Sequence, residues 1–177
     1  MEEKTLVCRV TAGEEEAMRL LVETYRPGLT RFLCRYVPPE DAEEIALDVF
    51  AAFLLHPKRY DGRASLKTYL YMMGRSRALT LLRRRRLTLP LEETWEAEED
   101  AIGASLLRSE RRRTLSEAMA TLPKRQREAL TLVYLEDLSY REAAQVLHCR
   151  EKQVDNLLTR AKATLRAVIG EEGRELL

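Results

Sequence analysis

The stretch SYREAAQVLHCREKQVDNLLTRAK, residues 139–162, holds two short helical patterns on either side of a tight corner. Ser139 and Glu142 have the spacing of a capping box, in which each side chain satisfies a free backbone N–H at a helix start, so a helix is expected from Tyr140. Apolar residues recur at helical spacing on both sides of a turn at 148–150: Ala143, Ala144, Leu147, Val154, Leu158, Ala161 and Leu165. A small residue, Ala144, lies where the helices cross. This pattern predicts a helix-turn-helix.

The second helix of this motif carries polar side chains on its outer face. Lys152, Asn156 and Arg160 recur every four residues and therefore share one stripe, with Gln153 beside its N-terminal end. Asn and Gln can pair with adenine edges, Lys can reach guanine or phosphate, and Arg suits backbone phosphates. Most polar stripes are only solvated faces, so the motif by itself leaves DNA reading and an ordinary amphipathic helix pair equally open.

The composition describes a globular chain. With 177 residues, 45% of them hydrophobic, it can form one ordinary domain or two small ones with a buried core. No window approaches 18 consecutive apolar residues and the N-terminus lacks a signal-peptide pattern, so we expect a soluble cytoplasmic protein without membrane insertion. The cysteines Cys8, Cys34 and Cys149 have no metal-ligand spacing. We expect reduced thiols, no metal and no other cofactor.

The net charge of +1 conceals blocks of opposite sign. Residues 1–56 hold 11 acidic and 6 basic side chains, whereas residues 57–90 hold 10 basic side chains and one acidic. Residues 91–110 are acidic again, and the remainder is mildly basic. Such alternation indicates several charged partners rather than one uniformly basic surface.

Nearly all of the remaining sequence has helical periodicity. Apolar residues recur at helical spacing over 20–36, until Pro38 and Pro39 end that helix, and a second helix is expected from Glu40 to about His56. Ser65 can cap a third helix that runs into the arginines at 83–86. Periodicity fades over 88–110, and no strand pattern occurs. We therefore predict an all-α protein with a domain at 1–87, a linker at 88–110 and a second domain at 111–177.

Two charged faces of the first domain are candidate binding surfaces. One is an acidic stripe that suits a basic protein partner: Asp41, Glu44 and Asp48. The other is a basic segment that can bind phosphates: Lys58, Arg59, Tyr60, Arg63, Arg75, Arg83, Arg84, Arg85 and Arg86. Unpaired bases could stack on its aromatic rings, Tyr60, Tyr69 and Tyr71, although a core position is favoured for Tyr69.

Three stretches, in this order, resemble bacterial RNA polymerase sigma factors of the extracytoplasmic-function group, the small two-domain type. DAEEIALDVFAAF, residues 41–53, is similar to the polymerase-binding helix of the family. YDGRASLKTYLYMMGRSRALTLLRRRR, residues 60–86, is similar to the segment that recognises and melts the minus-10 element. LPKRQREALTLVYLEDLSYREAAQVL, residues 122–147, and KQVDNLLTRAKATLR, residues 152–166, resemble the minus-35 domain.

The resemblance implies a sigma2-like bundle and a sigma4-like helix-turn-helix domain, joined by the acidic linker, which would thread toward the active-site cleft of the polymerase. The partners implied are core RNA polymerase, promoter DNA and an anti-sigma factor, while catalysis stays with the polymerase. The implied polymerase contacts are Asp41, Glu44 and Asp48. The implied minus-35 contacts are Lys152, Gln153, Asn156 and Arg160. The basic segment would hold a minus-10 base turned out of the duplex and the separated strand.

Several residues depart from the family pattern. In the first domain the departures are Leu47, Tyr69, Ser76 and Thr80. In the corner His148 replaces the usual turn glycine and Arg150 a common capping serine, while Asp155 and Leu157 stand where Lys and Arg are common. We therefore expect weaker phosphate attraction at the minus-35 surface, or a different base preference.

Three other functions compete with this one. A helix-turn-helix regulator that acts without polymerase would leave the acidic helix, the basic block and the acidic linker unexplained. An all-helical protein-interaction adaptor would bind no nucleic acid in a salt-sensitive manner. An enzyme fits least, because His56 and His148 are the only histidines and no phosphate-binding Gly-rich loop occurs. No catalytic residue is predicted.

Overall fold

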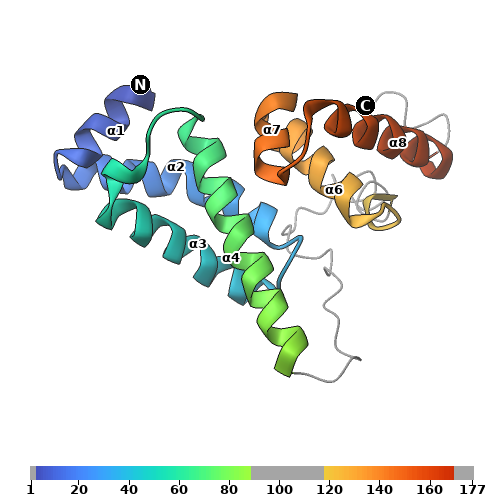
Figure 1. Cartoon of the computed structure of the whole chain (residues 1–177), viewed down its shortest axis with the longest axis horizontal. Coiled ribbons are helices and arrows are strands. Elements are labelled where there is room, and N and C mark those ends of the chain that lie inside the picture. The colour runs from blue at the N-terminus through green and yellow to red at the C-terminus, as the bar shows by residue number, and fades with distance from the viewer. Residues whose placement is uncertain (1–2, 89–117, 170–177) are drawn as a thin grey trace, which may run out of the picture. The chain divides into compact units, whose positions relative to one another are not determined.

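The computed structural model describes residues 3–88 and 118–169 of the chain. Helices dominate these two ranges and no strand occurs within them, which confirms the predicted all-α class. The chain divides into two compact units, Met1–Ala97 and Glu98–Leu177, coloured from blue to green and from yellow to red in Figure 1. Apart from Thr88, the predicted linker at 88–110 lies outside the described residues, so its boundaries stay a prediction.

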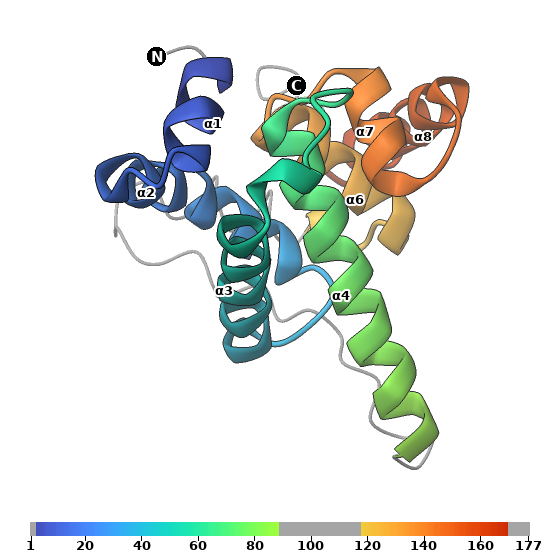
Figure 2. The same ribbon diagram turned by 60° about the vertical axis from the view of Figure 1, so that its left-hand side comes forward.

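The first unit is built on a helical hairpin. Its helices are α1 (Glu3–Thr11), α2 (Glu15–Leu33), α3 (Pro39–Leu55) and α4 (Leu66–Thr88), with a 3-10 turn at Pro57–Arg59. α2 packs against α3, and α4 lies across both (Figures 1 and 2). α3 starts with Pro39 at its first position and acidic residues in its first turn, which favour a helix N-terminus. As predicted, Ser65 caps α4, since its Oγ accepts a hydrogen bond from the Thr68 N–H at 3.3 Å.

The core of the first unit joins aromatic and aliphatic side chains of α2, α3 and α4. Its largest fully buried members are Tyr36, Tyr71, Phe32, Phe53, Leu21, Leu29, Leu33, Leu66 and Leu70. Gly74 permits the close crossing of α2 and α4, because a Cβ there would lie 3.0 Å from Cδ1 of Leu29. Tyr71 is 0% exposed, and its ring centroid is 5.3 Å from that of Phe32. The prediction that Tyr71 offers its ring to unpaired bases is therefore wrong, because the ring fills the core.

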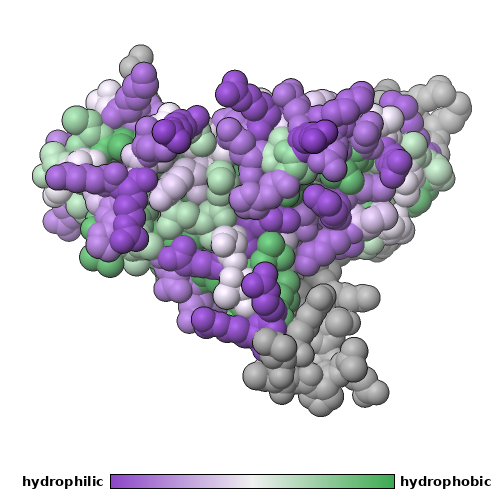
Figure 3. Space-filling model, viewed as in Figure 1, coloured by the Kyte–Doolittle hydropathy of each residue, from purple (hydrophilic) through white to green (hydrophobic). Residues whose placement is uncertain are grey.

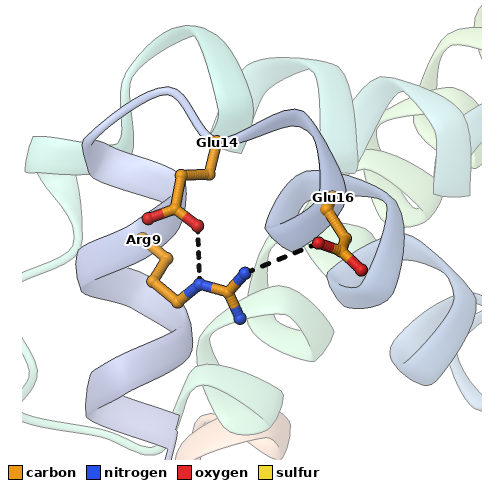
Figure 4. Close-up of polar contacts among 3 residues, drawn as sticks. All are labelled: Arg9, Glu14 and Glu16. Atoms are coloured by element: carbon orange, nitrogen blue, oxygen red, sulfur yellow. Dashed lines mark hydrogen bonds and ion pairs between the residues drawn. The ribbon is translucent and has the colours of Figure 1, made fainter.

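α1 was not predicted from the sequence, and it packs against α2 and the 3-10 turn. Gly13, at φ +85°, forms the corner between α1 and α2. Figure 4 shows the Arg9 guanidinium between two carboxylates, with Nε 2.7 Å from Oε2 of Glu14 and Nη2 4.0 Å from Oε2 of Glu16. Ion pairs exposed to solvent contribute little to stability, so burial of Leu6 and Val10 contributes more to the docking of α1.

The second unit contains the predicted helix-turn-helix. Its elements are α6 (Lys124–Leu130), a π-helical turn (Thr131–Leu135), α7 (Tyr140–Leu147) and α8 (Glu151–Ile169). The apolar stripe predicted for the corner is buried: Ala143, Ala144, Leu147, Val154, Leu158, Ala161 and Leu165. α8 packs against α6 and α7. The π-helical turn was not indicated by the sequence.

The corner has the predicted geometry. The Ser139 N–H donates to Oε2 of Glu142 at 3.0 Å, and the Glu142 N–H donates to Oγ of Ser139 at 3.3 Å, which completes the capping box. α7 ends at His148, whose backbone is left-handed (φ 50°, ψ 52°). A side chain in this conformation brings Cβ close to the following carbonyl oxygen, so His148 is a strained residue in the corner.

Replacing His148 by glycine is expected to raise the free energy of unfolding by about 1 kcal/mol, because glycine adopts the left-handed conformation without the Cβ clash. Urea denaturation followed by far-ultraviolet circular dichroism measures the change. His148→Ala is the matched control: it removes the imidazole but retains Cβ, and it should give no comparable gain. Equal stabilisation by both replacements would contradict this account of the corner.

Candidate nucleic-acid interfaces and an acidic face

The polar residues predicted to read DNA lie on the surface of α8. Lys152, Gln153, Asn156 and Arg160 are all exposed, whereas Val154 on the same helix is buried against the rest of the unit. This is the arrangement in which one face of the second helix is fixed by packing and the other can enter a DNA major groove. The structure therefore brings these four predicted residues together on one exposed helix surface.

Two of these four residues also make contacts at the start of α8. The Gln153 Oε1 atom accepts a hydrogen bond from the Arg150 N–H at 2.9 Å, so this side chain helps to cap the helix. Lys152 Nζ lies 2.8 Å from Oδ2 of Asp155. The hydrogen bond and the negative charge of this carboxylate raise the pKa of Lys152. Asp155 thus offsets part of the positive charge of the surface, in line with the expectation of weaker phosphate attraction.

The basic loop between α3 and α4 is held in shape by Tyr60. Its hydroxyl lies 2.6 Å from the Ala64 carbonyl oxygen and 2.9 Å from Oε1 of Glu3, and its ring centroid is 5.3 Å from that of Tyr69 and 6.3 Å from that of Phe53. Burial and the hydrogen bond to Glu3 raise the pKa of Tyr60. The half-buried Tyr60 ring is thus mainly a support of the loop.

The cations of this loop point outward. Lys58, Arg59 and Arg63 are exposed, and Arg63 has 89% of its side chain accessible. Arg63 also pairs with Asp61, which is the acidic residue of the basic block: Nε lies 3.3 Å from Oδ2, and the Arg63 N–H donates to Oδ1 at 3.0 Å. The loop consequently presents positive charge on an ordered backbone.

The arginines of α4 occupy different environments. Arg75 is half-buried, donates from Nε to the Tyr36 hydroxyl at 3.0 Å, and has its guanidinium carbon 5.9 Å from the centroid of that ring. Arg83 and Arg84 are exposed near the C-terminal end of the helix. Arg85 contacts Asp41, with Nη1 2.6 Å from Oδ2 and Nη2 2.9 Å from Oδ1. Arg86 lies in the last turns of α4.

The contact with Arg85 separates Asp41 from the other two carboxylates of the predicted acidic stripe on α3. Glu44 and Asp48 are exposed, whereas Asp41 is half-buried and joined to Arg85. Leu47, 52% exposed, lies between Glu44 and Asp48 in the sequence, and Leu55 on the same helix is 74% exposed. In the view of Figure 3, hydrophilic side chains cover most of the described surface, with hydrophobic areas between them.

The exposed Leu47 and Leu55 were not assigned to the acidic face of α3 from the sequence. Leu47, Ala51 and Leu55 recur every four residues and are all exposed, so they form an apolar row along α3. Their spacing could have revealed the row, since it falls off the buried face of the helix. The α3 face therefore combines carboxylates with apolar side chains, which suits a protein helix that is both basic and apolar.

Within residues 3–88 and 118–169 no group of His, Cys, Asp and Glu side chains could hold a metal ion. No helix in the same ranges is long and apolar enough to cross a membrane.

Two conserved regions of one protein family match the chain. Residues 21–88 match Sigma-70 region 2, and residues 112–165 match Sigma-70, region 4. The matches together cover more than half of the chain, and the first includes the acidic face of α3 and the basic segment, whereas the second includes the helix-turn-helix. The chain therefore belongs to the sigma-70 family of transcription-initiation factors.

Curated relatives narrow this to the extracytoplasmic-function (ECF) group. The chain is 27% identical to the ECF RNA polymerase sigma-E factor of Escherichia coli K12, with 93% of each chain covered. It is 27% identical to the Haemophilus influenzae sigma-E factor, with 92% of each covered. It is also 25% identical to the ECF sigma factor SigM of Bacillus subtilis, with 84% of this chain and 92% of SigM covered. The chain is an ECF sigma factor, which confirms the resemblance.

Solved structures share its fold. CnrH, solved in complex with the cytosolic domain of CnrY, has a TM-score of 0.67 and 23% identity, covering 94% of this chain and 96% of CnrH. The sigma factor RpoE of Bartonella quintana, solved with the anti-sigma factor NepR, has a TM-score of 0.66 and 19% identity, covering 86% of this chain and 96% of RpoE. The matches to the two sigma-70 regions and to the curated relatives give no support to the alternatives of an adaptor or a polymerase-independent regulator.

Proposed function

We propose that this chain directs core RNA polymerase to a set of promoters in the cytoplasm, reads their minus-35 and minus-10 elements, and keeps the minus-10 strands apart. The observation that supports this most directly is the position of its charges. Exposed polar residues of α8 lie on a helix-turn-helix, and exposed arginines of α4 lie in the same unit as the acidic, partly apolar face of α3. Catalysis stays with the polymerase, and this chain determines which promoters the polymerase binds.

The minus-35 element is read as duplex by the start of α8. A helix in this position places its first turns against base edges, where the Asn156 amide can pair with both N6 and N7 of adenine. Arg160, one turn further along the helix, suits a backbone phosphate. Lys152 and Gln153 are already bonded to Asp155 and to the Arg150 backbone, so they act as secondary contacts.

The minus-10 element is held as a separated strand by the basic segment. The loop cations Lys58, Arg59 and Arg63 lie before α4, and the exposed Arg83 and Arg84 lie near its end. An opened strand can follow such a track of cations. The unpaired state is favoured over the duplex where the loop also binds an unstacked base, since the duplex cannot make that contact. The loop, braced by Tyr60, would accept a base turned out of the stack.

The acidic face of α3 is the proposed site for core polymerase. Glu44 and Asp48 offer exposed carboxylates, and Leu47 adds an apolar contact between them. An anti-sigma factor is a further proposed partner, because RpoE of Bartonella quintana was solved with one. Such a partner would compete with polymerase if it covered this face.

The proposal is tested by reconstitution. Purified chain, mixed with core polymerase on fragmented genomic DNA, should yield transcripts that start downstream of a shared pair of elements, which sequencing of the transcript ends would reveal. Core polymerase without the chain is the control. Absence of chain-dependent start sites with any cognate core polymerase would refute the proposal.

Replacing Asn156 by alanine is expected to change the base preferred at one minus-35 position, with a loss of about 1–3 kcal/mol of discrimination, because a bidentate amide contact is removed. Binding of the holoenzyme to a library of minus-35 sequences measures the preference. Affinity for core polymerase should stay unchanged. A fall in core affinity with an unchanged base preference would show that this face of α8 belongs to the polymerase contact instead.

A further inference from the structure

Arg85 and Asp41 form a two-point contact between helices that are distant in sequence. Asp41 lies in the first turn of α3, and Arg85 lies near the end of α4, 44 residues later. The Arg85 Nη2 atom donates a hydrogen bond to Oδ1 of Asp41 at 2.9 Å, and Nη1 lies 2.6 Å from Oδ2 in an ion pair that lacks hydrogen-bond geometry. One hydrogen bond and a second close approach restrict the orientation of the guanidinium more than a single ammonium–carboxylate contact would.

The surroundings of this pair differ from those of the neighbouring arginines. The Asp41 side chain is 17% exposed and that of Arg85 is 41% exposed, whereas Arg83 and Arg84 are exposed to solvent. Each partner also suits its helix end, since a carboxylate is favoured at a helix N-terminus and a cation at a C-terminus. The contact is therefore a partly buried joint between the start of α3 and the end of α4.

We propose that Arg85 is a positioning residue that holds the basic end of α4 on the start of α3, so that Arg83 and Arg84 meet the separated strand. This inference rests on the proposed function of α4. It revises two sequence-based assignments, because Arg85 then acts on DNA only through its neighbours, and Asp41 supports α4 instead of contacting polymerase. The polymerase-facing carboxylates of α3 are then Glu44 and Asp48.

This joint ties strand binding to a residue on the polymerase-binding helix. Over residues 79–85 no side chain of α4 is fully buried, whereas Leu70, Tyr71 and Ala78 are, so packing fixes these turns less than it fixes the middle of the helix. A contact made by Arg85 limits the directions in which these last turns can point. Loss of either partner should therefore weaken strand binding, although only Arg85 carries a charge that attracts phosphate.

A double-mutant cycle tests the joint. Holoenzyme is reconstituted with Asp41→Asn, Arg85→Ala or both, and its affinity for the fluorescently labelled non-template strand of a promoter found by transcript sequencing is measured by anisotropy. Each single change should weaken binding about fivefold, and the double change should weaken it no further, because either one breaks the same contact. Arg85→Lys should fall between wild type and Arg85→Ala. Core affinity should be unchanged in all of these variants.

Arg84→Ala is the control, since its effect should add to that of Asp41→Asn. If Asp41→Asn strengthens or does not alter strand binding while Arg85→Ala weakens it, Arg85 contacts DNA directly and the inference is overturned. All measurements are made well below the melting temperature of each variant. A lower melting temperature with unchanged strand affinity would also overturn it, because the contact would then be structural only. If the proposed function of α4 is wrong, the wild-type holoenzyme itself will not bind the strand. That result is distinguishable from a failure of the Asp41–Arg85 joint, in which wild-type holoenzyme binds.

Discussion

Replacing Arg83 and Arg84 together by alanine is expected to reduce open-complex formation at least about tenfold, because two charge-assisted phosphate contacts of roughly 1 kcal/mol each are lost. Both side chains are exposed near the end of α4, so their removal leaves the core intact. The dependence of binding on salt should also flatten, since each phosphate contact to a single strand contributes about 0.7 to the logarithmic slope, and two contribute about 1.4. Permanganate reactivity of promoter thymines over a salt series measures both effects.

The matched control for this experiment is Arg19→Ala, which removes an exposed cation of α2 that does not belong to the basic segment. It should leave both the extent of opening and the salt slope unchanged. An undiminished slope in the Arg83 and Arg84 double variant would show that these side chains do not contact phosphates, even if opening were slower.

Reversing the charges of Glu44 and Asp48 to lysine is expected to weaken binding of core polymerase about a hundredfold, because each lysine would face the basic partner that the carboxylates attracted, and like-charge contacts cost several kcal/mol. Neither carboxylate forms an ion pair with another residue of the described ranges, so the change breaks no ion pair among them. Competition with a labelled sigma factor for core polymerase measures the affinity.

A second variant separates this local effect from the change in total charge. Glu15→Lys with Glu23→Lys alters the net charge by the same amount, and both residues are exposed on α2. This control should bind core polymerase nearly as tightly as wild type. Equal losses in the two double variants would mean that overall charge, and not the α3 face, governs docking.

The helix-turn-helix could be predicted because its determinants are local. The capping box needs only Ser139 and Glu142, three residues apart, and the buried stripe follows the helical repeat. The repeat also located the turn at 148–150, whereas the left-handed conformation of His148 is seen only in the structure. The exposure of Asn156 and Arg160 was predictable for the same reason, since a packed stripe on one side of a helix leaves the opposite side in water.

The contacts that join distant residues could not be predicted in this way. Asp41 and Arg85 each belonged to a separate charged pattern, and nothing in either pattern indicated that the two would meet. Tyr71 is an aromatic residue of the kind on which bases stack, but its ring faces the core. The close crossing of α4 with α2 at Gly74 determines which face of α4 is buried. Gln153 is ambiguous for a different reason, since an amide at a helix start can cap the helix, read a base edge, or do each in turn.

The contact between α1 and the basic loop has a practical consequence for anyone who wishes to study the first unit in isolation. The Sigma-70 region 2 match begins at residue 21, within α2, whereas Glu3 on α1 holds the Tyr60 hydroxyl from outside that match. A fragment cut at the family limit would lose all of α1 and begin inside a helix. In such a fragment the Tyr60 hydroxyl would keep its contact with Ala64 but lose its contact with Glu3, so binding data would describe an altered basic loop. A fragment of the first unit should therefore start at residue 1.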